Sequence, residues 1–483
     1  MELQDSALFK QKCYINGEWV GADKSIDVFN PADNRLLGTV PSLGGGGASA
    51  AIDAAQRAFV LWRKLTAKER SVYLRDWFDL INAHKKDLAR IMTSEQGKPL
   101  AEAEGEVLYG ASYVEWFAEE AKRVYGDTVP MSQKGKRIIV LKEPVGVCAA
   151  ITPWNFPSAM ITRKVAPALA AGCTIIVKPA VQTPYSAFAL AELAHRAGIP
   201  KGVLNIITGA AREIGAEFTG SSIVRKLSFT GSTPVGKQLM AACSKSVKKV
   251  SLELGGHAPF IIFDDADIDA AVVDAVSSKY RNAGQTCVCA NRFIVQEGVY
   301  QEFAEKLTIA VKEQLRVGSG FDAEVNQGPL IDLNAVIKVE DQIKDACDKG
   351  ATILAGGRRS DAGGYFFEPT ILMNVTTDMK IATEETFGPV APLFVFKEED
   401  EGVSMANDSE YGLASYFFSR DMARCWRVAE ALEYGMVGVN TGILSSEAAP
   451  FGGMKESGIG REGSKYGIEE YLEIKYMCLG GLA

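Results

Sequence analysis

The sequence predicts an α/β protein in which a parallel sheet is followed by a second α/β segment. Short apolar runs alternate with helices from Val145 onward, and several of these helices end at a glycine. Apolar strands separated by helical segments are typical of βαβ units and therefore of parallel sheets. The chain has 483 residues, 47% of them hydrophobic, which is enough for two or three packed domains.

The elements follow from hydrophobic periodicity, taken in chain order. Residues 50–61 and 69–92 carry apolar side chains at helical spacing, so the N-terminal region is expected to be mainly helical. Ligands bind at the carboxyl ends of parallel strands, so functional residues are expected just after each strand. The buried strands are predicted at 145–152, 173–178, 203–208, 224–229 and 249–254, with helices at 160–171 and 184–197.

A second α/β segment begins after Gly255-Gly256, with a strand at 259–263 and a helix at 269–280, and it extends to about residue 453. Residues 466–479 are apolar and strand-like, with little sequence left to cover them. A final strand of this kind usually completes a sheet elsewhere, either in the same chain or in another subunit.

The composition limits the classes of function. The formal charge is −8, from 52 basic and 60 acidic residues without a basic block, which disfavours binding to nucleic acid or to an anionic membrane. No apolar run reaches the roughly 18–20 residues of a membrane span, and the start lacks the pattern of a secretory signal. Nine scattered cysteines and three histidines indicate a reduced cytoplasmic protein without a bound metal.

Three features imitate functional motifs. The glycines at 44–47 precede a helix but lack the Gly-Lys-Ser/Thr ending of a phosphate loop, so we expect a flexible linker. Residues 458–463 match Gly-x-Gly-x-x-Gly literally, yet no βαβ unit surrounds them, and a surface or substrate-side loop is expected. His257 stands alone in the sequence, and a lone histidine is more often structural than catalytic.

Polar residues follow the predicted strands at the edge where ligands bind. Asn155 lies in a stiff turn between two prolines that can hold its amide as a fixed donor, although a purely structural turn fits equally well. Lys178 ends the second strand and suits an anionic or hydroxyl-rich ligand, or simple solvation of the strand end. Ser232 or Thr233 can cap a helix whose free N–H groups receive a diphosphate, or can form an ordinary capped connection.

Two further residues point to covalent chemistry. Glu253 is a carboxylate in an apolar strand end, where burial raises its pKa toward neutrality and suits it to act as a base. Cys287 follows a glycine-containing loop, and nearby backbone N–H groups are expected to favour its thiolate. An inert packed thiol is the alternative.

In this order, the motifs resemble those of the aldehyde dehydrogenase superfamily along nearly the whole chain. The motifs are Pro-Trp-Asn-Phe-Pro at 153–157, Phe-Thr-Gly-Ser at 229–232, Leu-Glu-Leu-Gly-Gly at 252–256, Gly-Gln-Thr-Cys at 284–287 and Glu-Thr-Phe-Gly-Pro at 385–389. The resemblance implies a homodimer or homotetramer whose subunit has three domains. These are a Rossmann-like cofactor domain at 1–122 and 144–254, a catalytic domain at 255–453, and a small β oligomerisation flap at 123–143 and 466–483.

The resemblance also assigns roles to residues. Cys287 is implied to be the nucleophile, Asn155 the oxyanion donor and Glu253 the base that activates water for thioester hydrolysis, with Lys178 among the catalytic residues. A base at this position favours hydrolysis over transfer to coenzyme A. Lys178 is implied to hold the adenosine ribose. The implied cofactor-binding residues are Thr152, Pro153, Trp154, Lys178, Ala180, Val181, Gly209, Gly215, Phe229, Thr230, Gly231, Ser232, Val235, Leu254, Glu385 and Phe387.

Residues 160–164, 279–289 and 463–467 resemble the succinate-semialdehyde dehydrogenase branch of this family. That branch implies a small aldehyde substrate whose distal carboxylate is bound by two arginines and a serine. Glutarate semialdehyde or another short ω-carboxy aldehyde is the alternative substrate, and structural ion pairs are the alternative role for the two arginines. The implied substrate-binding residues are Arg163, Arg281, Cys287 and Ser445.

Two positions bear on the cofactor and on regulation. Members of the family that prefer NAD often carry a glutamate three residues after the lysine, where this chain has Val181. Without that carboxylate a 2′-phosphate meets no like charge, so NADP is favoured, with NAD as the alternative. Cys289 lies two residues from Cys287, so a reversible disulfide between them is a further hypothesis.

Overall fold

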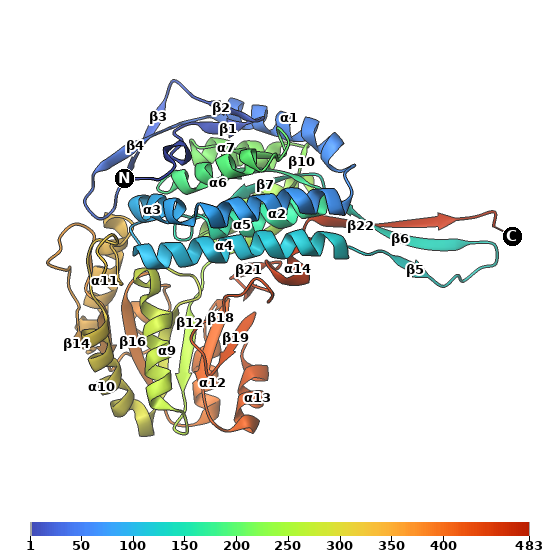
Figure 1. Ribbon diagram of the computed structural model, residues 1–483. Helices are drawn as coiled ribbons and strands as arrows, with labels where there is room; N and C mark the ends of the chain where they lie inside the picture. The colour runs from blue at the N-terminus through green and yellow to red at the C-terminus, as the bar shows by residue number, and fades with distance from the viewer. Residues whose placement is uncertain (1, 483) are drawn as a thin grey trace.

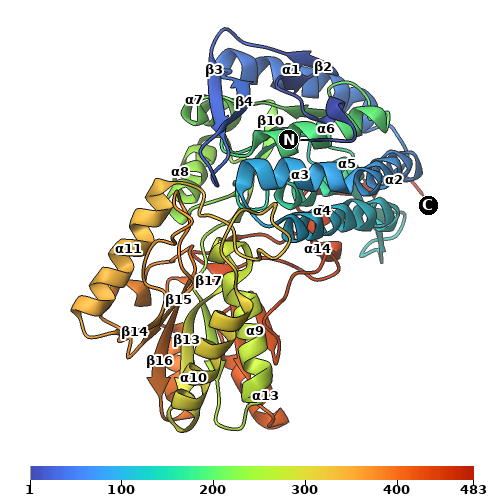
Figure 2. The same cartoon turned by 60° about the vertical axis from the view of Figure 1, so that its left-hand side comes forward.

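The computed structural model describes residues 2–482 and divides into three parts (Figures 1 and 2). An eight-stranded sheet with its helices forms the upper part in Figure 1, a seven-stranded sheet forms the lower part, and a long β-flap projects from the side. The predicted α/β class with a parallel sheet, a second α/β unit and a flap is therefore confirmed. Residues 1 and 483, at the outer ends of the predicted ranges 1–122 and 466–483, lie outside the described residues.

The centre of the first sheet consists of the five predicted strands, all parallel to one another. They are β9 (Leu204–Ile206), β8 (Thr174–Lys178), β7 (Val147–Ile151), β10 (Val224–Thr230) and β11 (Lys249–Glu253), in that spatial order. Antiparallel strands close both edges, with β1 (Cys13–Ile15) and β2 (Glu18–Val20) at one and β21 (Gly458–Ile459) at the other. The buried strands form one core with the helices on both faces.

The prediction that the N-terminal region is mainly helical is only partly correct. Besides β1 and β2, the hairpin of β3 (Ser25–Phe29) and β4 (Leu36–Pro41) precedes the first long helix. These strands are short, and most of their side chains are exposed or half-buried, so they lack a clear alternating apolar pattern. The helical periodicity of the residues that follow therefore led to the prediction of a mainly helical region.

The helices of the first part cover its sheet. They are α1 (Gly45–Trp62), α2 (Ala67–Ala83), α3 (Lys85–Gln96), α4 (Leu100–Glu120), α5 (Ala159–Ala171), α6 (Pro184–Arg196), α7 (Ala211–Gly220) and α8 (Thr233–Cys243). The predicted helix 69–92 is two helices, because the chain leaves helical geometry at His84. Thr66 and Glu69 form a capping box at the start of the first one.

The glycines at 44–47 are not a flexible linker, contrary to the prediction. Gly44 is the N-cap of α1, and the next three glycines form its first turn. A Cβ atom at Gly47 would lie 2.8 Å from the Cβ atom of Leu43, and one at Gly44 would lie 2.6 Å from the carboxylate of Glu213. The glycines are thus explained by close packing at the start of the helix.

The second sheet is parallel except at one edge. Its order is β14 (Thr352–Ala355), β15 (Thr370–Met373), β16 (Val390–Phe396), β13 (Ala290–Gln296), β12 (Ala258–Ile262), β18 (Ala414–Phe418) and β19 (Met436–Val439), with β14 antiparallel. Two apolar clusters pack on this sheet. Its helices are α9 (Ile268–Tyr280), α10 (Glu297–Gln314), α11 (Leu333–Asp348), α12 (Glu399–Asn407) and α13 (Met422–Ala431), and β17 (Tyr411–Gly412) pairs with β20 (Met454–Lys455).

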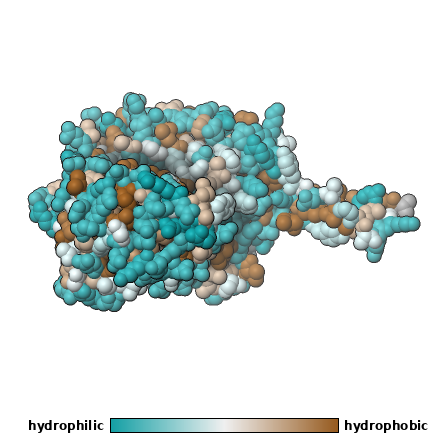
Figure 3. Space-filling model, turned by 90° about the horizontal axis from the view of Figure 1, so that it is seen from below, coloured by the Kyte–Doolittle hydropathy of each residue, from teal (hydrophilic) through white to brown (hydrophobic). Residues whose placement is uncertain are grey.

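The flap contains β5 (Asp127–Val129), β6 (Arg137–Pro144) and β22 (Leu472–Leu479). The predicted final strand at 466–479 is shorter than expected, because α14 (Ser464–Glu469) occupies the first part of that range. β22 pairs with β6 of its own chain along its whole length. Apolar side chains remain exposed on this projection (Figure 3), with Ile474 at 73% and Tyr476 at 62% of full exposure.

No helix among residues 2–482 is long and apolar enough to cross a membrane.

Candidate active site

Two cavities meet at Cys287, in the region between the two sheets. One, of about 300 Å³, is lined by residues from the ends of the first sheet and from the loop at 385–387. The other, of about 310 Å³, is lined by α4, α5 and the segment 443–451. Cys287 lines both cavities. A side chain at this junction can be reached by two different molecules at once.

The loop that carries Cys287 has an unusual backbone. Asn282 and Ala283 have φ values of 52° and 55°, and Gly284 follows with a φ of 74°. A Cβ atom at Gly284 would lie 2.2 Å from the carbonyl oxygen of Gly388, so only glycine fits there. On the other side, a Cβ atom at Gly256 would lie 2.3 Å from the carbonyl oxygen of Cys287. The nucleophile loop is therefore enclosed by backbone on two sides.

The thiol of Cys287 differs from the sequence expectation. Its pKa is raised to about 12, mainly by burial; the guanidinium of Arg163 opposes this effect, and the carboxylates of Glu385 and Glu253 add to it. No backbone N–H of residues 2–482 donates to its sulfur, and desolvation of the charged sulfur disfavours the thiolate, contrary to the sequence expectation. Cys287 and Cys289 are both free thiols.

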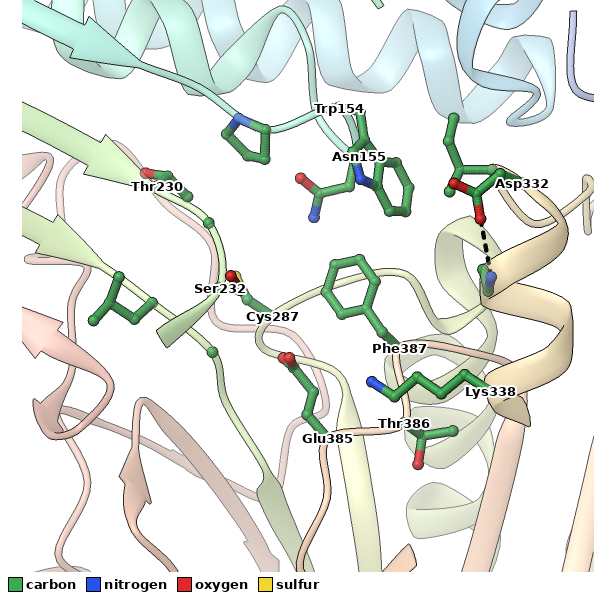
Figure 4. Close-up of a pocket in the computed structure, with 16 residues that line it drawn as sticks. Trp154, Asn155, Thr230, Ser232, Cys287, Asp332, Lys338, Glu385, Thr386 and Phe387 are labelled. Atoms are coloured by element: carbon green, nitrogen blue, oxygen red, sulfur yellow. Dashed lines mark hydrogen bonds between the residues drawn. The ribbon is translucent and has the colours of Figure 1, made fainter. Parts of the chain in front are cut away.

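Asn155 lies beside Cys287, as Figure 4 shows. Its Nδ2 donates to the carbonyl oxygen of Gln285 at 3.1 Å, and its Oδ1 accepts from the backbone N–H of Phe156 at 3.1 Å. The amide is thereby fixed in orientation, and Nδ2 has a second hydrogen left to donate. The arrangement fits an oxyanion donor better than a purely structural turn.

Glu253 ends β11, level with Thr230 on the neighbouring strand. Its carboxyl group is buried, and neither oxygen has a hydrogen-bond partner among the described residues. Burial and the nearby carboxylate of Glu462 raise its pKa well above the usual value. Glu253 is not among the residues that line either cavity. A position facing Gly452 explains this, since a Cβ atom there would lie 2.9 Å from its Oε1.

The first cavity contains half of the cofactor residues that the sequence predicted. Trp154 and Phe387 pack edge to face with ring centroids 5.5 Å apart, and Glu385 Oε1 accepts from the Gly256 N–H at 3.0 Å. Figure 4 shows these side chains around one space. The predicted residues that line the cavity are Pro153, Trp154, Thr230, Gly231, Ser232, Leu254, Glu385 and Phe387.

The start of α8 faces this cavity. Ser232 is the N-cap residue, but its side chain makes no capping hydrogen bond, contrary to the simple capped connection that the sequence allowed. A helix N-terminus with unpaired N–H groups is a favourable place for phosphate oxygens. Gly231 is also required by packing, because a Cβ atom there would lie 2.5 Å from the Phe229 ring.

The other predicted cofactor residues lie outside the first cavity. Gly215 and Val235 line a groove of about 830 Å³ between α7 and α8. Lys178 is buried at the end of β8 without an ion-pair partner among residues 2–482, and burial lowers its pKa to about 8. A buried cation without a carboxylate suits an anionic or hydroxyl-rich ligand. The remaining residues, which line none of these spaces, are Thr152, Ala180, Val181, Gly209 and Phe229.

The second cavity contains the residues predicted to bind substrate: Arg163, Arg281 and Ser445. The two arginines differ in their charge environment. Arg163 forms an ion pair of 2.6 Å with Glu462, and its guanidinium lies 3.9 Å from the centre of the Phe451 ring. Arg281 forms no ion pair with an acidic side chain among residues 2–482. It is the cavity cation whose charge is not already neutralised by a direct partner.

Sequence reasoning missed the contribution of α4 and the segment before it. Lys98, Glu102 and Glu106 line the second cavity, and Lys98 pairs with Glu106 at 2.5 Å with both side chains buried. Two glutamates four residues apart on one helix were the available signal, because they lie on the same face. On the cofactor side, the missed residues include Asp332 and Lys338 from the region of α11.

Two of the features that imitate functional motifs lie near the site, His257 and the stretch 458–463. His257 is buried, and its Nε2 donates to the carbonyl oxygen of Ala382 at 3.0 Å, which fits a structural histidine. The stretch 458–463 contains the short strand β21, which pairs with β11, so it is more ordered than the predicted loop. Among residues 2–482, no three potential metal ligands of the His, Cys, Asp and Glu types form a group.

The chain is similar in sequence and in structure to known enzymes. The aldehyde dehydrogenase family matches residues 19–477. A glutarate-semialdehyde dehydrogenase of Pseudomonas putida is 64% identical, over 99% of this chain and 100% of its own length. A succinate-semialdehyde dehydrogenase [NADP(+)] of Escherichia coli is 63% identical, over 99% and 100% of the two chains. The crystal structure of a succinate-semialdehyde dehydrogenase from Burkholderia pseudomallei matches with a TM-score of 0.99 and 60% identity, over 99% and 100% of the chains.

Proposed function

This chain belongs to the aldehyde dehydrogenase family, and we propose that it oxidises succinate semialdehyde to succinate with NADP in the cytoplasm. The observation that carries the choice of substrate is Arg281, a cation without an ion-pair partner among residues 2–482, in a cavity that ends at Cys287. A guanidinium at one end and a nucleophile at the other suit an aldehyde with a distal carboxylate. Relatives at 63% and 64% identity act on succinate and glutarate semialdehydes, so glutarate semialdehyde is the second candidate.

The first chemical step uses Cys287 and Asn155. The thiolate attacks the aldehyde carbon, and the resulting oxyanion accepts a hydrogen bond from the free Nδ2 hydrogen of Asn155. Because burial raises the pKa of Cys287 to about 12, the thiol must lose its proton as the attack proceeds. This proton passes to solvent, so that Glu253 remains free to accept a proton in the step that follows.

The second step releases the acid. A bound nicotinamide would supply the hydride acceptor, and loss of hydride from the substrate carbon would leave a thioester on Cys287. Glu253 then takes a proton from the water that attacks the thioester. Since Glu253 faces Gly452 and lines neither cavity, its side chain must rotate toward Cys287 for this step. Its buried setting and raised pKa make it an effective base.

The residues of the first cavity, together with Lys178 outside it, fit a dinucleotide. Ser232 and the N-terminus of α8 would hold the diphosphate, Glu385 the nicotinamide ribose and Lys178 the adenosine ribose. Val181, three residues after Lys178, adds no negative charge near the 2′ position. A 2′-phosphate is therefore tolerated, and the relative from Escherichia coli is named for NADP(+).

The domain roles follow the same reasoning. We assign cofactor binding to residues 1–122 and 144–254, catalysis to 255–453, and subunit contact to the flap at 123–143 and 466–483. The exposed apolar side chains of β22 support an assembly of two or four copies, because they are unusual on a surface that faces water.

The function is tested by initial rates with succinate semialdehyde, glutarate semialdehyde and butanal, each with NADP and with NAD. We expect NADP reduction to be fastest with succinate semialdehyde and slowest with butanal at equal concentration. Equal rates with butanal would contradict the proposal that the second cavity binds the carboxylate of the substrate. Faster turnover with glutarate semialdehyde would support the second candidate.

A further inference from the structure

The nucleophile loop has a backbone conformation that it cannot easily keep by itself. Asn282 and Ala283 both lie in the left-handed region, directly before Gly284. Left-handed geometry is uncommon for residues other than glycine, and it persists only where surrounding groups impose it. Alanine in particular has no side-chain group that could stabilise this conformation. The groups that hold this loop in place therefore affect the position of Cys287, three residues after Gly284.

Two side chains from outside the loop hold Asn282. The carboxylate of Glu102, on the first turn of α4, accepts a hydrogen bond from the backbone N–H of Asn282 at 3.0 Å. Gln96, the last residue of α3, donates through Nε2 to the Asn282 Oδ1 at 2.9 Å. Gln96 is fully buried, so its amide has no competing solvent contact.

The same group of contacts reaches the oxyanion donor. Asn282 donates through Nδ2 to the carbonyl oxygen of Asn155 at 3.0 Å. Lys98 donates to the same carbonyl at 2.8 Å, and the carboxylate of Glu106 accepts from Lys98 at 2.5 Å. The turn that carries Asn155 and the loop that carries Cys287 are thus joined through Asn282.

We propose that Glu102 is a positioning residue that fixes the nucleophile loop in register with Asn155, with Gln96 as its supporting partner. The proposal rests on the proposed function, because it assumes that Cys287 and Asn155 act together on one carbonyl. Glu102 itself does not touch either group. It acts through the backbone of Asn282, where one carboxylate oxygen stabilises an otherwise strained turn.

The test compares Glu102→Ala, Glu102→Gln and wild type by kcat with succinate semialdehyde and with butanal, using NADP. Each protein is also treated with iodoacetamide, and the rate of Cys287 alkylation is measured without aldehyde. Glutamine keeps an oxygen that can accept the Asn282 N–H, whereas alanine does not. Glu104→Ala is the matched control, because Glu104 lies on the same helix and instead pairs with Lys85 at 3.0 Å.

We expect Glu102→Ala to lower kcat about 10- to 100-fold with both aldehydes, because a small displacement of reacting groups has a large effect on rate. The same change should raise the alkylation rate about threefold or more, since a loosened loop exposes the thiol. Glu102→Gln should stay close to wild type in both measurements, and Glu104→Ala should match wild type. Because unfolding would also expose the thiol, the unfolding midpoint of each variant is measured, and Glu102→Ala should remain folded at the assay temperature.

The proposal is overturned if Glu102→Ala keeps kcat within about twofold of wild type, or if Glu102→Gln loses as much as Glu102→Ala. If Glu102→Ala does not fold, Gln96→Glu provides the second variant, because it places an acceptor against the Asn282 Oδ1 and should lower kcat while speeding alkylation. Wild-type protein that oxidises neither aldehyde would contradict the proposed function, whereas the alkylation rates would still test the role of Glu102.

Discussion

Replacing Arg281 by methionine should weaken the use of carboxylated aldehydes without affecting uncharged ones. Arg281 has no direct ion-pair partner among the described residues, so a substrate carboxylate can use its full hydrogen-bonding capacity. A hydrogen bond to a charged group contributes about 1.5–3 kcal/mol, which corresponds to roughly 10- to 150-fold in kcat/KM. Because the Arg281 side chain is only partly buried, we expect the lower part of that range.

Arg163 should respond differently, although it lines the same cavity. It already pairs with Glu462, which also pairs with Lys164 at 2.5 Å. Removing one partner from a buried ion pair costs about 3–5 kcal/mol of stability, and the remaining lysine places Arg163→Met near the lower end. The loss would also leave more uncompensated negative charge beside Glu253, whose pKa Arg163 lowers. Activity should therefore fall with every aldehyde.

The assay measures kcat/KM for succinate semialdehyde and for butanal in wild type, Arg281→Met and Arg163→Met, with unfolding midpoints for all three. The expected pattern is a selective loss in the Arg281 variant and an unselective loss in the Arg163 variant. The reasoning is refuted if Arg281→Met lowers kcat/KM equally for both substrates, or if Arg163→Met lowers kcat/KM only for the carboxylated substrate.

Three further predictions concern the thiol and the cofactor. Because burial raises the pKa of Cys287 to about 12, its alkylation by iodoacetamide should rise about tenfold per pH unit from about pH 7 to about pH 9; a plateau in this range would show a lower pKa. Val181→Glu should shift the ratio of kcat/KM values from NADP toward NAD by about tenfold or more, through repulsion of the 2′-phosphate; an unchanged ratio would place the 2′-phosphate elsewhere. If Cys287 and Cys289 form a reversible disulfide, dithiothreitol should restore the activity that wild type loses in peroxide. The Cys289→Ala variant cannot form this disulfide and should not show the same reversible inactivation. Identical reversible inactivation of that variant would exclude the disulfide.

The parallel strands of the first sheet were predictable because they are buried on both faces. A strand such as β8, with every residue buried, gives a continuous apolar run that ends in a polar residue at the carboxyl edge. The strands β1 and β2 were missed because they are short and lie at an edge, where alternation is weak. The prediction of a flexible linker at the glycines 44–47 was wrong because these glycines allow close packing against Leu43, a contact that exists only in the folded chain.

The site was predictable where a polar residue lies at or just after the carboxyl end of a predicted strand, as for Asn155 and Glu253. The pKa of Cys287 was not, because a local sequence does not reveal how completely a thiol is desolvated. Nor could the sequence show that Glu462 pairs with Arg163 across 299 positions of sequence number, or that Glu102 contacts Asn282. The first contact depends on the return of the C-terminal segment to the first sheet, and the second depends on how α4 packs against the second part.

The central claim is that Cys287 carries the acyl group, and trapping that group tests it most directly. Glu253→Gln enzyme is mixed with succinate semialdehyde and NADP, and the peptide that contains Cys287 is analysed by mass spectrometry. We predict a mass increase of one succinyl group on Cys287, together with a burst of about one NADPH per subunit followed by slow turnover. An unmodified Cys287 during steady turnover, or a succinyl group on another residue, would contradict the account.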